Sequence, residues 1–129
     1  MNIFLYSTIS KEGGRKIDEL LKTILPKEKI AVYENIDELS RRLKHPGQEG
    51  SIGILAPGSR QEILEILARR DLFRDLKTII IAPDHETETI NLAYQLRPRF
   101  LTYLNGDMGD LAAVISKIVS SQGSNGNKK

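Results

Sequence analysis

Residues 51–59 read SIGILAPGS, and this stretch decides the architecture that the sequence predicts. The short apolar run from Ile52 to Ala56 ends at a Pro-Gly-Ser turn, and a helical pattern of apolar residues begins directly after it. An apolar run without polar alternation is typical of a strand that is covered on both faces, as in a parallel sheet. Ligands of parallel sheets usually bind at the carboxyl ends of the strands. Here that end carries Ala56 and Pro57, which have no ionisable or hydroxyl group.

The rest of the chain alternates strand patterns with helix patterns. Runs of bulky and β-branched residues predict four further strands, at residues 2–7, 29–34, 77–83 and 100–104. The second strand is short and flanked by charged residues, which is typical of an edge strand. Helices are predicted after every strand, and the third is expected to end near residues 71–73. Asn35, Ser59 and Asp84 are expected N-caps, the first two with a glutamate three residues later as in a capping box.

Five strands that alternate with five helices over short connections predict a parallel sheet with helices on both faces. The expected fold is therefore a three-layer, doubly wound α/β domain with strand order 2-1-3-4-5, the flavodoxin-like layout. One domain is expected to span residues 1–119. Residues 120–129 hold no large apolar side chain and are expected to form a disordered tail.

The composition excludes several classes of function. The 129 residues are 40% hydrophobic and 28% charged, as in ordinary globular domains, and the net charge of +2 does not indicate nucleic acid or a membrane surface as a partner. The absence of cysteine excludes disulfides and thiolate metal sites. No apolar run approaches the ~20 residues that span a bilayer, and the N-terminus lacks the features of a signal peptide, so the cytoplasm is the expected location.

The order, spacing and size of these elements, together with residues 93–102 (AYQLRPRFLT), resemble a response-regulator receiver domain over residues 1–120. The resemblance implies an acidic pair that binds magnesium, an aspartate acceptor after the third strand, a hydroxyl after the fourth and a lysine after the fifth. Such a set neutralises the charge of a transferring phosphoryl group. In this chain those positions are occupied by uncharged residues: Ser7 and Thr8, Ala56, Ala82, and Tyr103 or, with a shifted alignment, Asn105.

The chain therefore resembles a degenerate receiver, or pseudo-receiver, which implies a non-enzymatic signalling domain of the two-component type that binds a protein or itself. In such domains the surface of the fourth helix and fifth strand is the usual binding face, which points to Tyr94, Arg97, Phe100 and Tyr103. Tyrosine is a favoured interface anchor. Phe100 matches the family's aromatic switch position, but without a hydroxyl at position 82 we interpret it as a packing residue. Tyr103 has a second interpretation, in which it folds over the vacated site.

Two other hypotheses come from different classes. Residues 7–14, with their hydroxyls and glycines before a helix, predict a weak phosphate or nucleotide site, although Glu12 would repel an anion. Asp84, His85 and Glu86 form an acidic cluster with one of the two histidines, which we interpret as a favourable first helical turn rather than as a catalytic or metal site. No cofactor and no metal are expected.

Overall fold

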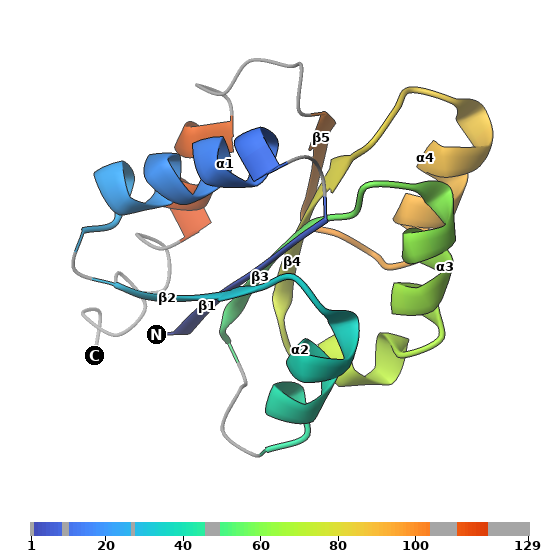
Figure 1. The fold of residues 1–129 in the computed structure, drawn as a ribbon, viewed down its shortest axis with the longest axis horizontal. Helices are drawn as coiled ribbons and strands as arrows, with labels where there is room; N and C mark the ends of the chain where they lie inside the picture. Colours follow the sequence, from blue (N-terminus) through green and yellow to red (C-terminus); the bar gives the residue numbers. More distant parts are fainter. Residues whose placement is uncertain (1, 9–10, 27, 46–49, 104–110, 119–129) are drawn as a thin grey trace.

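The computed structural model describes residues 2–8, 11–26, 28–45, 50–103 and 111–118. Within them the chain forms a single five-stranded sheet with the order β2-β1-β3-β4-β5, and every neighbouring pair is parallel (Figure 1). The predicted three-layer α/β fold and its strand order 2-1-3-4-5 are confirmed. The strands are β1 (Asn2–Ser7), β2 (Lys29–Tyr33), β3 (Ile52–Ala56), β4 (Lys77–Ala82) and β5 (Phe100–Tyr103).

The helices cover the two faces of this sheet. One face carries α1 (Lys11–Ile24) and a last helix at residues 111–118, and the other carries α2 (Ile36–Leu43), α3 (Arg60–Leu67) and α4 (Thr87–Tyr94) (Figure 1). β2 lies at the edge of the sheet, as its length and flanking charges predicted. In the part of the chain that the structure describes, no helix is long and apolar enough to cross a membrane.

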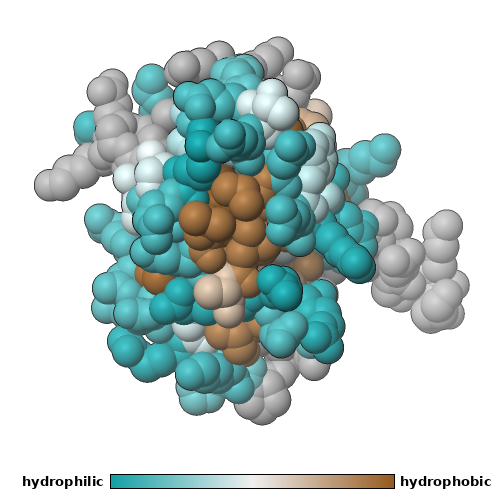
Figure 2. Space-filling model, turned by 90° about the vertical axis from the view of Figure 1, so that its right-hand side faces the viewer, coloured by the Kyte–Doolittle hydropathy of each residue, from teal (hydrophilic) through white to brown (hydrophobic). Residues whose placement is uncertain are grey.

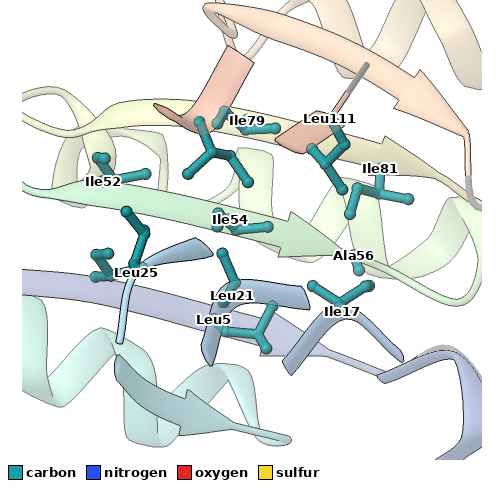
Figure 3. Close-up of a cluster of buried hydrophobic side chains, with 12 residues drawn as sticks. Leu5, Ile17, Leu21, Leu25, Ile52, Ile54, Ala56, Ile79, Ile81 and Leu111 are labelled. Atoms are coloured by element: carbon teal, nitrogen blue, oxygen red, sulfur yellow. The ribbon is translucent and has the colours of Figure 1, made fainter. Parts of the chain in front are cut away.

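The core consists of two hydrophobic clusters, one on each face of the sheet. Alternate residues of a strand point to opposite faces, so β1 contributes Ile3 and Leu5 to one cluster and Phe4 and Tyr6 to the other. Figure 3 shows the first cluster, in which strand residues such as Ile54 lie among side chains from α1 and the last helix. All five residues of β3 are buried, as expected for the central strand.

The predicted end of the third helix is wrong. α3 ends at Leu67, and a separate 3₁₀ helix (Arg70–Phe73) follows it. Between the two, Arg69 leaves the helical region with φ −116° and ψ 22°, which redirects the chain. This turn brings Phe73 into the core, where it is buried against the second cluster. The tail predicted at residues 120–129 lies outside the described residues, as does Asn105.

Candidate functional site

The carboxyl edge of the sheet, where β1, β3, β4 and β5 end, brings together the positions that the receiver resemblance singled out. Ser7 is the register partner of Ala56, and Ala82 is the register partner of Tyr103. Ser7, Ala56 and Ala82 are all buried, while Thr8 and Tyr103 are half-buried. The end of β3 therefore presents a buried methyl group where an acceptor carboxylate would have to reach solvent.

A hydrogen-bonded network fills the space beside Ala56. The hydroxyl groups of Tyr6 and Thr8 both donate to Oε1 of Glu62, the first over 2.7 Å. Thr8 is itself held in place, because its Oγ1 accepts from the backbone N–H of Gly58 at 2.9 Å and its own N–H donates to the Ala56 carbonyl at 3.2 Å. The network ties the end of β1 to the first turn of α3.

Glu62 has a different role from the one that its position predicts. Ser59 is the N-cap of α3, as expected, and its Oγ accepts from the Glu62 N–H at 3.4 Å. A capping box would turn the Glu62 carboxylate back to the backbone of Ser59. The carboxylate instead accepts from two hydroxyls on β1 and the residue after it. Two oriented hydroxyl donors offer it more hydrogen bonds than one backbone N–H.

The Tyr6 hydroxyl stays protonated in this network. Burial raises the pKa of Tyr6 well above its ordinary value, and the hydrogen bond to Glu62 and the negative charge of that carboxylate raise it further. A phenolate here would lose its solvation and face a like charge. The group is therefore a permanent hydrogen-bond donor at physiological pH and not an acid or base.

Ser7 points to the other face of the sheet from Tyr6 and Thr8. Its buried Oγ has no hydrogen-bond partner among the described residues. Buried polar groups without a partner are uncommon and costly, so this hydroxyl is a place where a ligand or water would gain a hydrogen bond. The Glu62 carboxylate near the end of the same strand disfavours an anion at this edge.

At the carboxyl edge, Arg60 links the first turn of α3 to the start of α4. Its guanidinium contacts Glu86 at 2.6 Å, Glu88 at 2.8 Å and Thr89 Oγ1 at 3.1 Å. Asp84 lies next to this group, and its Oδ1 accepts from the Glu86 N–H at 2.9 Å. Glu86 and Glu88 are thus engaged in ion pairs with Arg60, but Asp84, His85 and Glu86 precede Thr87, the first residue of α4, and do not form the first helical turn that the sequence was interpreted to give.

The prediction that Asp84 caps the fourth helix is wrong in detail. α4 begins at Thr87 with Glu86 at the N-cap, and the Glu86 side chain makes no capping bond. Asp84 closes a turn two residues ahead of that position. The hydrogen bonds from the Glu86 N–H and from Thr89 are the main causes that lower the pKa of Asp84. Asn35, by contrast, is confirmed as an N-cap, since its Oδ1 accepts from Asp37 N and Glu38 N.

Tyr103 is stacked on His85. The two ring centroids are 3.6 Å apart and the ring planes differ by 15°. His85 belongs to the connection between β4 and α4, so the stack covers the end of β4 where the hydroxyl position of the resemblance, Ala82, lies buried. Both interpretations of Tyr103 remain compatible with this arrangement, because the ring covers the edge and is still half-exposed.

The other predicted partner-binding residues lie in two places. Tyr94 is 59% exposed on α4, and the exposed Arg97 follows it, with its N–H donating to the Tyr94 carbonyl at 3.0 Å. Arg97 has a left-handed backbone conformation with φ 55°. Phe100 lies on the opposite face of the sheet from α4 and packs against the first core cluster. The structure therefore places Phe100 in packing and leaves Tyr94, Arg97 and Tyr103 at the surface.

The described residues at this edge offer no metal site. Among the described residues no group of three or more His, Cys, Asp or Glu side chains is placed to hold a metal ion. A hollow of about 480 Å³ lies near the start of β1 and β2, between Ile3, Phe4, Lys29 and Arg42. Arg42 lies over the Phe4 ring there, with 5.5 Å between the guanidinium carbon and the ring centroid.

Comparisons of the chain with family models, with curated proteins and with solved structures give no match. The geometry of the carboxyl edge is therefore the basis for inferring function. The residues that organise this edge, Tyr6, Arg60, Glu62 and Thr89, were not singled out as a site from the sequence. Their partners are 26 to 56 positions away along the chain, and no local pattern indicates such pairs.

Proposed function

We propose that this chain is a pseudo-receiver: a non-enzymatic signalling domain of the two-component type that acts by binding another protein, or a second copy of itself, without being phosphorylated on aspartate. The observation that carries the proposal is the buried Ala56 at the end of the central strand, in a fold with strand order 2-1-3-4-5. Phosphoryl transfer to a receiver needs a solvent-accessible carboxylate at that position and a cation beside it.

The surroundings of Ala56 support the same proposal. The nearest carboxylate in the network is Glu62, and both of its donors, Tyr6 and Thr8, bind the same oxygen. Ala82 and Tyr103 supply neither a hydroxyl on β4 nor an ammonium group on β5. A phosphoryl group at this edge would meet the Glu62 carboxylate, and the nearby Arg60 is already paired with Glu86 and Glu88, so the negative charge raises the barrier instead of lowering it.

The proposed binding surface is the exposed side of α4 and the turn that follows it. Tyr94 and Arg97 are exposed there, and Tyr and Arg are the residue types enriched at interface hot spots. Tyr103 lies apart from these two residues, at the carboxyl edge beside His85.

Two measurements test the proposal. Incubation with acetyl phosphate and magnesium is expected to leave the intact mass unchanged, and the gain of one phosphoryl group would contradict the proposal. In the second, Tyr94→Glu is expected to reduce capture of a protein partner from cells that produce the chain. Val32→Glu is the matched control, because Val32 is 51% exposed but lies on β2, the edge strand farthest from β5. Equal capture by both variants would exclude the α4 surface.

A second candidate function is the binding of a small molecule at the carboxyl edge, and the unpartnered hydroxyl of Ser7 favours it. The Glu62 carboxylate makes a neutral or cationic ligand a better fit than a phosphate. A thermal-shift screen of nucleotides, flavins, inorganic phosphate and polyamines, compared between the wild type and Ser7→Ala, separates the two functions. A ligand that stabilises the wild type and not the variant would support the second candidate.

A further inference from the structure

An apolar strip, the α3–α4 strip, runs between the outer sides of these two helices. Arg60 on α3 contacts Glu88 on α4, so the helix faces that carry these two residues lie side by side. Residues four positions apart share a face of a helix. The faces that start at Arg60 and Glu88 therefore continue through apolar residues. These are Leu64 on α3 with Ala68 at its C-cap, and Leu92 on α4 with Leu96 two residues after that helix.

The strip is open to solvent. Leu64 is 44% exposed, Ala68 is exposed, and Leu92 and Leu96 are half-buried. Figure 2, which views the side of the molecule that carries α3 and α4, shows an apolar patch framed by hydrophilic residues. A contiguous apolar patch with a polar frame is typical of an interaction surface, whereas isolated exposed apolar residues are common on any protein.

The two ends of the strip carry opposite charge. Both helices follow strands of a parallel sheet, so they run in the same direction and their amino ends share one end of the strip. At that end two exposed carboxylates, Glu86 and Glu88, share a single cation, Arg60. At the other end Arg70 follows α3, while Arg97 and Arg99 follow α4. These three exposed arginines take part in none of the ion pairs found among the described residues.

We propose that the α3–α4 strip binds a second copy of this chain in a two-fold symmetric dimer. The two-fold axis lies between the two copies, passes near Leu64 and is perpendicular to the long direction of the strip. A two-fold rotation reverses the direction of the strip. The acidic end of one copy then faces the basic end of the other, twice in each dimer, while Leu64 packs against the same residue of the second copy. An isologous interface uses the same patch on both subunits, so that patch must be complementary to itself. The opposite charges at the two ends of the strip meet this requirement.

This interface shares Arg97 with the surface of the proposed function but does not include Tyr94. Tyr94 belongs to another stripe of α4, four residues after Ile90, and Glu88, Leu92 and Leu96 form the stripe beside α3. Changes at Tyr94 and changes at Leu64 therefore test different statements, and the failure of one leaves the other standing.

Sedimentation velocity over a wide range of protein concentration tests the dimer. The wild type is expected to dimerise, with weaker association as salt increases. Leu64→Glu brings two carboxylates together at the axis and is expected to weaken the dimer at least tenfold. Ala68→Glu is a second variant on the same stripe, for use if the first does not fold as judged by circular dichroism. Val32→Glu is the control and is expected to leave the dissociation constant unchanged.

A charge-swap experiment distinguishes the two-fold arrangement from other contacts. The variant Arg70→Glu with Arg99→Glu has two acidic ends, and the variant Glu86→Lys with Glu88→Lys has two basic ends. Each variant alone is expected to be monomeric where the wild type is dimeric, and an equimolar mixture is expected to form the heterodimer. A wild type that stays monomeric at every concentration, a dimer that Leu64→Glu and Ala68→Glu leave intact, or a mixture that does not associate would each overturn the proposal.

Discussion

The hydrogen bond between Tyr6 and Glu62 provides a direct test of the network at the carboxyl edge. Tyr6 is a buried residue, 2% exposed, and Tyr6→Phe removes its hydroxyl while keeping its ring, so packing is preserved. The bond is 2.7 Å long and its acceptor is a carboxylate. Hydrogen bonds to charged groups contribute about 1.5–3 kcal/mol to stability. Because Thr8 still donates to the same oxygen, we expect a loss near the lower limit, about 1.5 kcal/mol.

The assay is equilibrium unfolding in urea, followed by circular dichroism. The midpoint concentration of urea is expected to fall in Tyr6→Phe without a change in the m-value, because the surface exposed on unfolding stays the same. Tyr33→Phe is the matched control, since Tyr33 is half-buried on β2 and its hydroxyl makes no hydrogen bond among the described residues. The control is expected to change stability by less than about 0.5 kcal/mol.

A double-mutant cycle with Glu62→Ala separates the hydrogen bond from unrelated effects of each change. If the two groups interact as described, the losses in free energy of unfolding are not additive, and the interaction energy is about 1–2 kcal/mol. The reasoning is refuted if Tyr6→Phe unfolds at the same urea concentration as the wild type, or if the two losses add within about 0.3 kcal/mol.

Three further predictions concern pH, the proposed loss of phosphotransfer and helix capping. The wild type is expected to lose stability as pH rises above about 10, because Tyr6 then ionises in the unfolded chain while its raised pKa keeps it protonated in the folded chain. In Tyr6→Phe the urea midpoint should fall less steeply with pH, and equal slopes for the two proteins would contradict this. Ala56→Asp places an unpaired carboxylate at a buried position and is expected to cost about 3–5 kcal/mol of stability at neutral pH, and less in acid, where the carboxylate is protonated. The variant is also expected to remain unmodified by acetyl phosphate in an intact-mass measurement. Asn35→Ala removes the acceptor for two N–H groups of α2 and is expected to cost about 1 kcal/mol by urea unfolding. Asn91→Ala on the exposed side of α4 is the control, and it is expected to cost no stability because alanine favours a helix more than asparagine does.

The fold could be predicted from the sequence because its determinants are local. The apolar run from Ile52 to Ala56 and the run from Lys77 to Ala82 indicate buried parallel strands by themselves, and short connections leave few ways to order them. Asn35 and Ser59 were recognised as caps because a cap bonds to N–H groups two or three residues away. Such signals lie within the same few residues as the structure that they predict.

The candidate site could be predicted only in part, because its hydrogen bonds join distant segments. The positions Ser7, Ala56, Ala82 and Tyr103 were expected at one edge, since parallel strands end together. The direction of the Glu62 side chain was missed, because a capping box and a bond to β1 use the same residue and only the packed fold decides between them. The link from Arg60 to α4 and the stack of His85 on Tyr103 depend in the same way on how the helices are placed.

The central place of β1 has a consequence for how the chain is made. β1 is synthesised before both of its partners. It pairs with β2 on one edge and with β3 on the other, so its second edge stays open until residues 52–56 have left the ribosome. During that interval its apolar residues Ile3 to Tyr6, all buried in the finished sheet, offer unpaired backbone groups to other chains. Nascent chains that stall before Ile52 are therefore the species most prone to aggregate, and a chaperone that shields the first strand would act before the third is complete.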